Sequence, residues 1–136
     1  MKIIACVDDL GGMMFNNRRQ SRDRILVEDV VRTSRGSTLY IDEYSKALFA
    51  DFEGSYTVAQ NMLDVATGAD FCFVENKRLG GIADRINEII LYRWNRRYPS
   101  DFKFDIDLEA EGFCLCEASE FAGYSHEKIT KEVYRR

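Results

Sequence analysis

Three short, unbroken apolar runs place the strongest limit on how this chain folds. They occupy residues 3–7, 71–74 and 89–92, the last inside a longer strand candidate at 88–94, and each is bounded by polar or turn residues. Runs of this length without polar alternation are typical of strands buried on both faces, which occur mainly in parallel sheets. The first run ends in Asp8, Asp9 and, after one residue, a Gly-Gly pair, so we expect a central strand followed by a turn.

The segments between these runs have helical spacing. Ser21 is predicted to cap a helix that extends to Thr33. Shorter helices are expected after a β-prone run at 38–41 and between 58 and 65, and only a brief one fits 76–87. Strands alternate with helices over the first two thirds of the chain and then continue alone. This order predicts an α/β fold with a mixed, mainly parallel central sheet flanked by helices and a C-terminal antiparallel hairpin.

The length of 136 residues fits one hydrophobic core, so we predict a single α/β domain over residues 1–136. The last segment, 128–134, fits a strand or a capped helix equally well by pattern alone. No apolar run reaches the length of a membrane span, and we expect no membrane partner.

Histidine and cysteine limit the chemistry of the chain. His126 is the sole histidine, which excludes metal sites that need two imidazoles, and no metal is predicted. His126 fits a lone base or an exposed turn residue, and its polar neighbours favour the exposed turn. The cysteines lie in apolar runs without a Cys-x-x-Cys pair, which predicts buried, reduced thiols in a cytoplasmic protein. They are Cys6, Cys72, Cys114 and Cys116.

Arginines gather in two places. The first group is Arg18, Arg19, Arg22 and Arg24, and the second is Arg93, Arg96 and Arg97 around Trp94. The first group fits either a pocket for phosphate or carboxylate groups or a solvated face paired with nearby acids. The second fits a stacking site or a strand end with its tryptophan packed inward. The formal net charge of −4 argues against general nucleic-acid binding.

Several segments together resemble the dihydrofolate reductase family. The similarity lies in the opening strand and its Val-Asp-x-x-x-Gly loop at 3–13, the strand and helix at 37–49, and the C-terminal pattern at 83–94, 101–107, 112–117 and Phe121. The resemblance implies that family's fold, with 128–134 as the last strand. It also implies an NAD(P)H-dependent oxidoreductase if the chain is an enzyme.

The sequence departs from the family where substrate and cofactor bind. Arg18 and Arg19 stand near the position of a Pro and Trp that shape the family's substrate mouth. Asp23 is the nearest counterpart of its acidic residue. Glu75 and Asn76 replace a Gly-Gly pair that lets the backbone approach the NADPH pyrophosphate, and a carboxylate there repels phosphate. NADPH is therefore disfavoured as a cofactor.

We expect a small protein of this fold that binds an anionic, nucleotide-like or pterin-like ligand without standard reductase activity. The candidate ligand-binding residues are Arg18, Arg19, Arg22, Glu75 and Asn76. Asp23 is the candidate catalytic acid, although a helix-terminal carboxylate is the simpler interpretation. An active NADPH-dependent reductase with an altered cofactor site, and nucleotide or nucleic-acid binding through the arginines, remain alternatives. The oligomeric state is left open.

Overall fold

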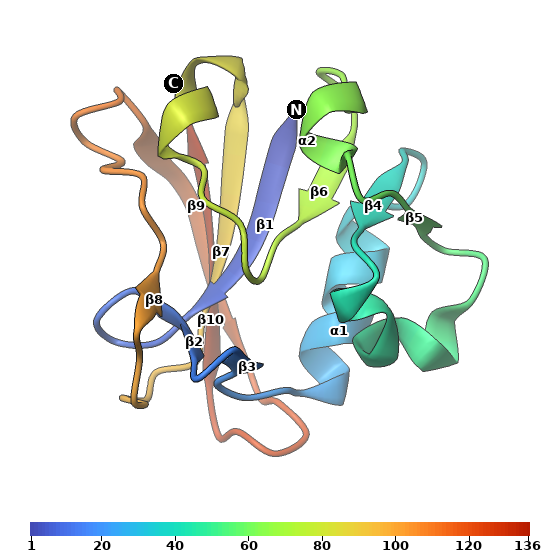
Figure 1. Cartoon of the computed structure of the whole chain (residues 1–136). Coiled ribbons are helices and arrows are strands. Elements are labelled where there is room, and N and C mark those ends of the chain that lie inside the picture. Colours follow the sequence, from blue (N-terminus) through green and yellow to red (C-terminus); the bar gives the residue numbers. More distant parts are fainter.

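A seven-stranded sheet organises the chain, and the computed structural model describes all residues from 1 to 136 (Figure 1). Its strands lie in the order β5-β4-β6-β1-β7-β10-β9. Their bounds are Lys2–Val7 (β1), Leu39–Ile41 (β4), Thr57–Val58 (β5), Phe71–Phe73 (β6), Glu88–Arg93 (β7), Cys114–Phe121 (β9) and Ile129–Arg135 (β10). The first strand is central, as predicted, since β6 and β7 flank it in parallel.

The direction of the strands confirms the predicted mixed sheet. The pairs formed by β4 with β5 and β6 are also parallel, whereas β10 runs antiparallel to both β7 and β9. Segment 128–134 is therefore strand from Ile129 onward, because its pairing with β7 and β9 decides what the local pattern left open.

A second, three-stranded sheet holds the arginine-rich loop. Its order is β3-β2-β8, with bounds Gly12–Phe15 (β2), Arg18–Arg19 (β3) and Phe102–Lys103 (β8). Asn16 and Asn17 join β2 to β3 with φ values of 53° and 60°. Two consecutive left-handed residues make the tight turn that suits a two-residue hairpin. This hairpin therefore sets the position of Arg19 at the end of β3.

Helices cover both faces of the large sheet. Helix α1 (Arg24–Thr33) and the 3-10 segment η1 (Tyr44–Phe52) pack on one face. Helix α2 (Met62–Val65), the 3-10 segment η2 (Gly80–Arg85) and β2 lie against the other. The helix predicted at 58–65 is shorter than expected because Thr57 and Val58 pair with β4 at the sheet edge. None of the helices is long and apolar enough to cross a membrane.

Two sequence expectations about local structure are wrong. Helix α1 is capped by Asp23, not Ser21, because the Asp23 carboxylate accepts hydrogen bonds from the N–H groups of Ile25 and Leu26. Cys114 and Cys116 are exposed, since β9 forms the outer edge of the sheet and its residues are nearly all exposed.

Candidate functional site

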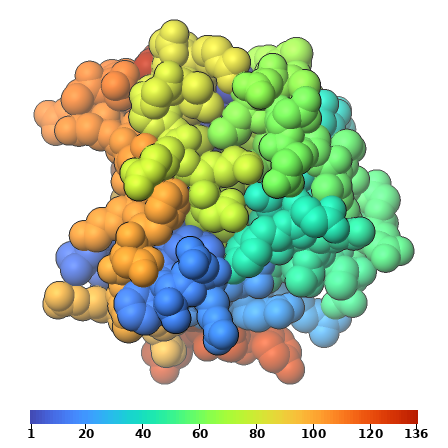
Figure 2. Space-filling view, viewed as in Figure 1, coloured from blue at the N-terminus to red at the C-terminus, as the bar shows by residue number.

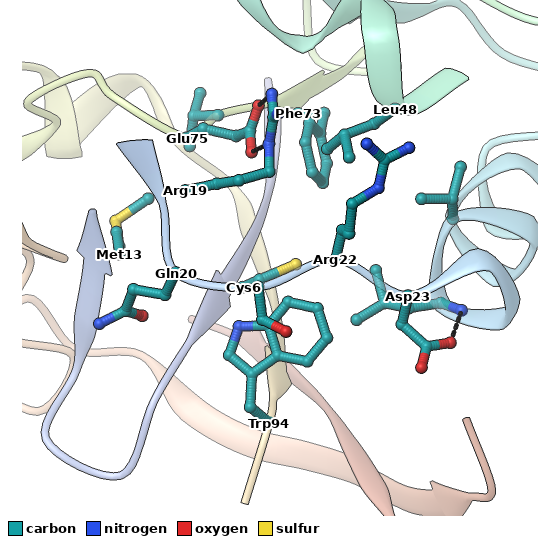
Figure 3. A pocket seen from close by; sticks show the side chains of 14 residues that line it. Cys6, Met13, Arg19, Gln20, Arg22, Asp23, Leu48, Phe73, Glu75 and Trp94 are labelled. Carbon is teal, nitrogen blue, oxygen red and sulfur yellow. Dashed lines mark hydrogen bonds and ion pairs between the residues drawn. The ribbon is translucent and has the colours of Figure 1, made fainter. Parts of the chain in front are cut away.

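A pocket opens between the large sheet and the pair α1 and η1; we call it the sheet–helix pocket (Figure 3). Strands supply Cys6 and Phe73 to its wall, and Trp94 follows β7 directly. The remaining lining residues are Met13, Arg19, Gln20, Ser21, Arg22, Asp23, Leu26, Val27, Leu48, Val74 and Glu75. Apolar walls with a few polar groups at one side are the lining that small-molecule sites have, although the enclosed cavity itself is small, about 20 Å³.

Arg19 and Glu75 close one side of this pocket through an ion pair (Figure 3). Arg19 Nε donates to Glu75 Oε1 at 2.8 Å and Nη2 donates to Oε2 at 3.0 Å. Ser45 Oγ also donates to Oε2 at 2.7 Å. The Arg19 guanidinium lies over the ring of Tyr44, 4.5 Å from its centroid. The structure thus brings two predicted ligand-binding residues together, and each neutralises the charge of the other.

The other predicted ligand-binding residues differ in position. Arg22 lines the sheet–helix pocket, is exposed, and forms no ion pair. Its guanidinium extends toward Leu48 in Figure 3. Arg18 and Asn76 are exposed outside the pocket lining. Arg22 is therefore the predicted residue that presents a free cation beside the apolar surface.

Asp23 is almost fully buried, and donors from two segments surround it. Its Oδ1 accepts from the N–H groups of Ile25 at 3.0 Å and Tyr124 at 3.0 Å. Its Oδ2 accepts from Ser125 N–H at 2.9 Å and lies 2.8 Å from His126 Nδ1. Asp23 thus caps α1 and ties it to the loop between β9 and β10.

These contacts also determine the protonation of Asp23. Burial alone would raise the pKa of this carboxyl, but hydrogen bonds, chiefly from Tyr124 and His126, hold it well below its usual range. A carboxylate that stays ionised near neutral pH is a poor proton donor and a good partner for a positive imidazole.

His126 is buried, so the prediction of an exposed turn residue is wrong. Its Nδ1 faces Asp23, and its Nε2 lies 3.0 Å from Ser21 Oγ and 3.2 Å from Tyr98 Oη. Its ring stacks on Trp94 with the centroids 4.6 Å apart. Sequence pattern could not reveal this environment, because Asp23, Trp94 and Tyr98 all lie far from His126 along the chain.

A second buried carboxylate, Asp8, positions the neighbouring loops. It accepts from Gly12 N–H at 2.7 Å, Tyr98 N–H at 3.2 Å and Gln20 Nε2 at 3.1 Å. Burial opposes ionisation of Asp8, yet hydrogen bonds led by that from Gly12 lower its pKa. The Asp that follows the first strand therefore holds the segment of Gln20 and Ser21 against that of Tyr98.

The second arginine group does not form a stacking site. Trp94 packs inward against His126 and lines the sheet–helix pocket, which agrees with the inward-packed interpretation. Arg93 pairs with Glu132, and Arg96 and Arg97 are exposed. No group of three or more His, Cys, Asp or Glu side chains is arranged to hold a metal ion.

The sheet order and the flanking helices define an α/β fold with a mainly parallel sheet and a terminal antiparallel hairpin. More specifically, this is a dihydrofolate reductase-like fold. A solved structure, dihydrofolate reductase from Enterococcus faecalis complexed with NADP(H) and RAB-propyl, superposes with a TM-score of 0.71 over 99% of this chain and 95% of that chain. The identity is 9%, so the likeness concerns the fold. No family model and no curated protein matches the sequence.

Proposed function

We propose that the chain binds a small anionic ligand with a flat ring, of the pterin or nucleotide kind, at the mouth of the sheet–helix pocket, without standard NADPH-dependent reduction. The observation that carries the proposal is the unpaired guanidinium of Arg22 beside an apolar pocket with two aromatic side chains, Phe73 and Trp94. Aromatic side chains favour packing against a flat ring. A guanidinium matches the geometry of phosphate and carboxylate groups.

The environment of Glu75 supports the absence of a standard cofactor site. The similar enterococcal structure is described as a complex with NADP(H), and the resemblance places a Gly-Gly pair where this chain has Glu75 and Asn76. Glu75 is a charged side chain held at the end of β6 by Arg19 and Ser45. A fixed carboxylate and its bulk both oppose the approach of a pyrophosphate.

The state of Asp23 supports the absence of the standard reaction. As the nearest counterpart of the family's acidic residue, Asp23 would have to supply or relay a proton to the substrate. Its two oxygens are instead engaged by backbone N–H groups, Ser125 and His126. These hydrogen bonds give the Asp23 carboxylate a structural role, because they hold the two loops together.

The single tryptophan allows a direct binding test. Trp94 is the only Trp in the chain and lines the pocket, so a ring bound there should quench its fluorescence. Folate, AMP, ATP and NADPH are titrated separately. We expect one of the first three to quench Trp94 with a micromolar dissociation constant and NADPH to have no effect in that range.

A pair of variants tests the role of the free cation. Arg22→Gln should weaken the anionic ligand about tenfold, which corresponds to one charged hydrogen bond. Arg24→Gln removes the same charge two residues away, outside the lining of the sheet–helix pocket, and should change affinity little. Micromolar NADPH binding with turnover would instead support the altered reductase, and absence of quenching by every ligand would overturn the proposal.

A further inference from the structure

Three side chains at the rim of the sheet–helix pocket form a continuous hydrogen-bonded series. Asp23 Oδ2 lies 2.8 Å from His126 Nδ1, and His126 Nε2 lies 3.0 Å from Ser21 Oγ. The three residues come from the loop before α1 and from the loop between β9 and β10. A carboxylate, an imidazole and a hydroxyl in this order constitute the arrangement that activates serine as a nucleophile.

The orientation of the imidazole is fixed from several sides. Asp23 accepts a hydrogen bond from the Nδ1–H group of His126. The Nε2 atom therefore keeps its lone pair, which faces Ser21. The stacking contact with Trp94 restrains rotation of the ring. Because Asp23 remains ionised, it also stabilises the positive imidazolium that forms when Nε2 takes a proton.

The hydroxyl group is positioned at a site that a ligand can reach. Ser21 is half-buried and lines the sheet–helix pocket together with the buried Asp23, whereas His126 is buried outside the pocket lining. The backbone N–H groups of Ser21 and Arg22 donate no hydrogen bond to a backbone acceptor in the protein. Free donors next to a nucleophile are suited to an oxygen that gains negative charge.

We propose that Ser21 is a nucleophile, with His126 as its general base and Asp23 as the residue that positions His126, and that the chain hydrolyses a carboxylic ester. A short acyl group of the substrate, such as acetyl, would lie in the sheet–helix pocket, whose cavity is about 20 Å³. An anionic group on the substrate would lie near Arg22, and this feature alone rests on the proposed function.

The reaction balances without a cofactor. Ser21 Oγ bonds to the acyl carbon while its proton passes to His126 Nε2. The bond from the acyl carbon to the leaving oxygen then breaks, and Nε2 gives the proton to that oxygen, which releases the alcohol. Water attacks the acyl-serine, its proton passes through Nε2 back to Ser21 Oγ, and the carboxylic acid leaves.

Tyr98 provides an internal test of this geometry. Its hydroxyl lies 3.2 Å from the same Nε2 that faces Ser21, and a neutral imidazole offers one lone pair there. The two hydroxyls therefore compete as donors. Removal of the Tyr98 hydroxyl should leave the lone pair to Ser21 and increase the reactivity of Ser21.

The experiment uses a fluorophosphonate probe, which phosphonylates activated serines with loss of fluoride. The full chain is incubated with the probe and the modified residue is located by peptide mass spectrometry. We expect modification at Ser21, a rate about 100-fold lower in His126→Gln, and a higher rate in Tyr98→Phe. Release of nitrophenolate from p-nitrophenyl acetate should follow the same order.

Ser119→Ala is the matched control. Ser119 is an exposed serine of β9 outside the lining of the sheet–helix pocket, so its removal should leave labelling of Ser21 in place, and Ser21→Ala should abolish labelling. Absence of an adduct at Ser21, or equal labelling in His126→Gln and the parent chain, would overturn the proposal. If His126→Gln does not fold, Tyr98→Phe decides, because labelling no faster than in the parent chain contradicts the geometry. None of these measurements depends on ligand binding, so their failure is distinct from failure of the proposed function.

Discussion

The guanidinium of Arg19 and the carboxylate of Glu75 form two parallel hydrogen bonds, of 2.8 and 3.0 Å. The pair joins β3 of the small sheet to the residue that follows β6 of the large sheet by two positions. Each charge is neutralised within the protein, so a ligand that needs either one has to displace the other.

Glu75→Gln should therefore improve binding of phosphate groups. The substitution removes the negative charge and leaves Arg19 as an unpaired cation, and we expect pyrophosphate to bind about fivefold more tightly by calorimetry. Breaking a largely buried pair should also cost about 2 kcal/mol of stability. Glu28→Gln breaks an exposed pair with Arg32 and should alter neither quantity. Unchanged pyrophosphate affinity in Glu75→Gln would show that this pair does not restrict access.

Asp23→Ala should strongly destabilise the fold. The substitution leaves the N–H groups of Ile25, Tyr124 and Ser125 without their acceptor, and we expect a loss of about 3 kcal/mol in urea unfolding followed by Trp94 fluorescence. Asp101→Ala is the control, since exposed Asp101 accepts one bond from Asn16 N–H. A similar loss in both variants would contradict this assignment.

The stability of the fold should fall at acid pH because Asp8 and Asp23 then become protonated. Asp8 and Asp23 both have a pKa below its unfolded value, so each contributes stability that is complete above the unfolded value of about 3.9 and is lost as pH falls toward the folded value. The unfolding free energy, measured between pH 7 and pH 3, should be nearly constant down to about pH 5 and then decline. Asp23→Asn should reduce the slope of that decline.

Gly123→Ala should disrupt the contact between α1 and the last hairpin. A Cβ at this glycine would lie 2.6 Å from Asp23 Oδ2 and 2.9 Å from Ile129 Cδ1. Such overlap should cost about 2 kcal/mol in thermal or urea unfolding. Gly68→Ala is the matched control, because a Cβ there meets nothing within 4 Å. Equal stability of the two variants would refute the close packing of Gly123.

The thiols should separate into two classes of reactivity. Cys114 and Cys116 are exposed, whereas burial raises the pKa of Cys72 to about 11 and also raises that of Cys6. With a disulfide reagent at pH 8, the two cysteines of β9 should react at once and the other two only on unfolding. Rapid modification of all four thiols in the folded chain would contradict the raised pKa of the half-buried Cys6 and the burial of Cys72.

The sheet could be predicted well from sequence because its strands have simple local signals. The apolar runs at 3–7, 71–74 and 89–92 become the centres of β1, β6 and β7, since a strand buried on both faces needs uninterrupted apolar residues. Segment 128–134 could not be resolved locally, because pairing with distant strands determines its structure.

The site was less predictable, because its contacts join residues that are distant in the sequence. The sequence shows the arginine group at 18–24. Its residue pattern does not indicate that Arg19 pairs with Glu75 while Arg22 forms no ion pair. The polar neighbours of His126 indicate exposure, and only the folded chain shows that Asp23 and Trp94 enclose the ring.

The cap of α1 has a consequence for synthesis on the ribosome. Tyr124, Ser125 and His126 follow Asp23 by 101, 102 and 103 residues. A nascent chain that already holds α1 and the central strands thus lacks these donors to the Asp23 carboxylate until the last hairpin has left the exit tunnel. Contacts of such long sequence separation form slowly, so we expect α1 to dock stably on the sheet only after β9, β10 and the loop between them have been synthesised.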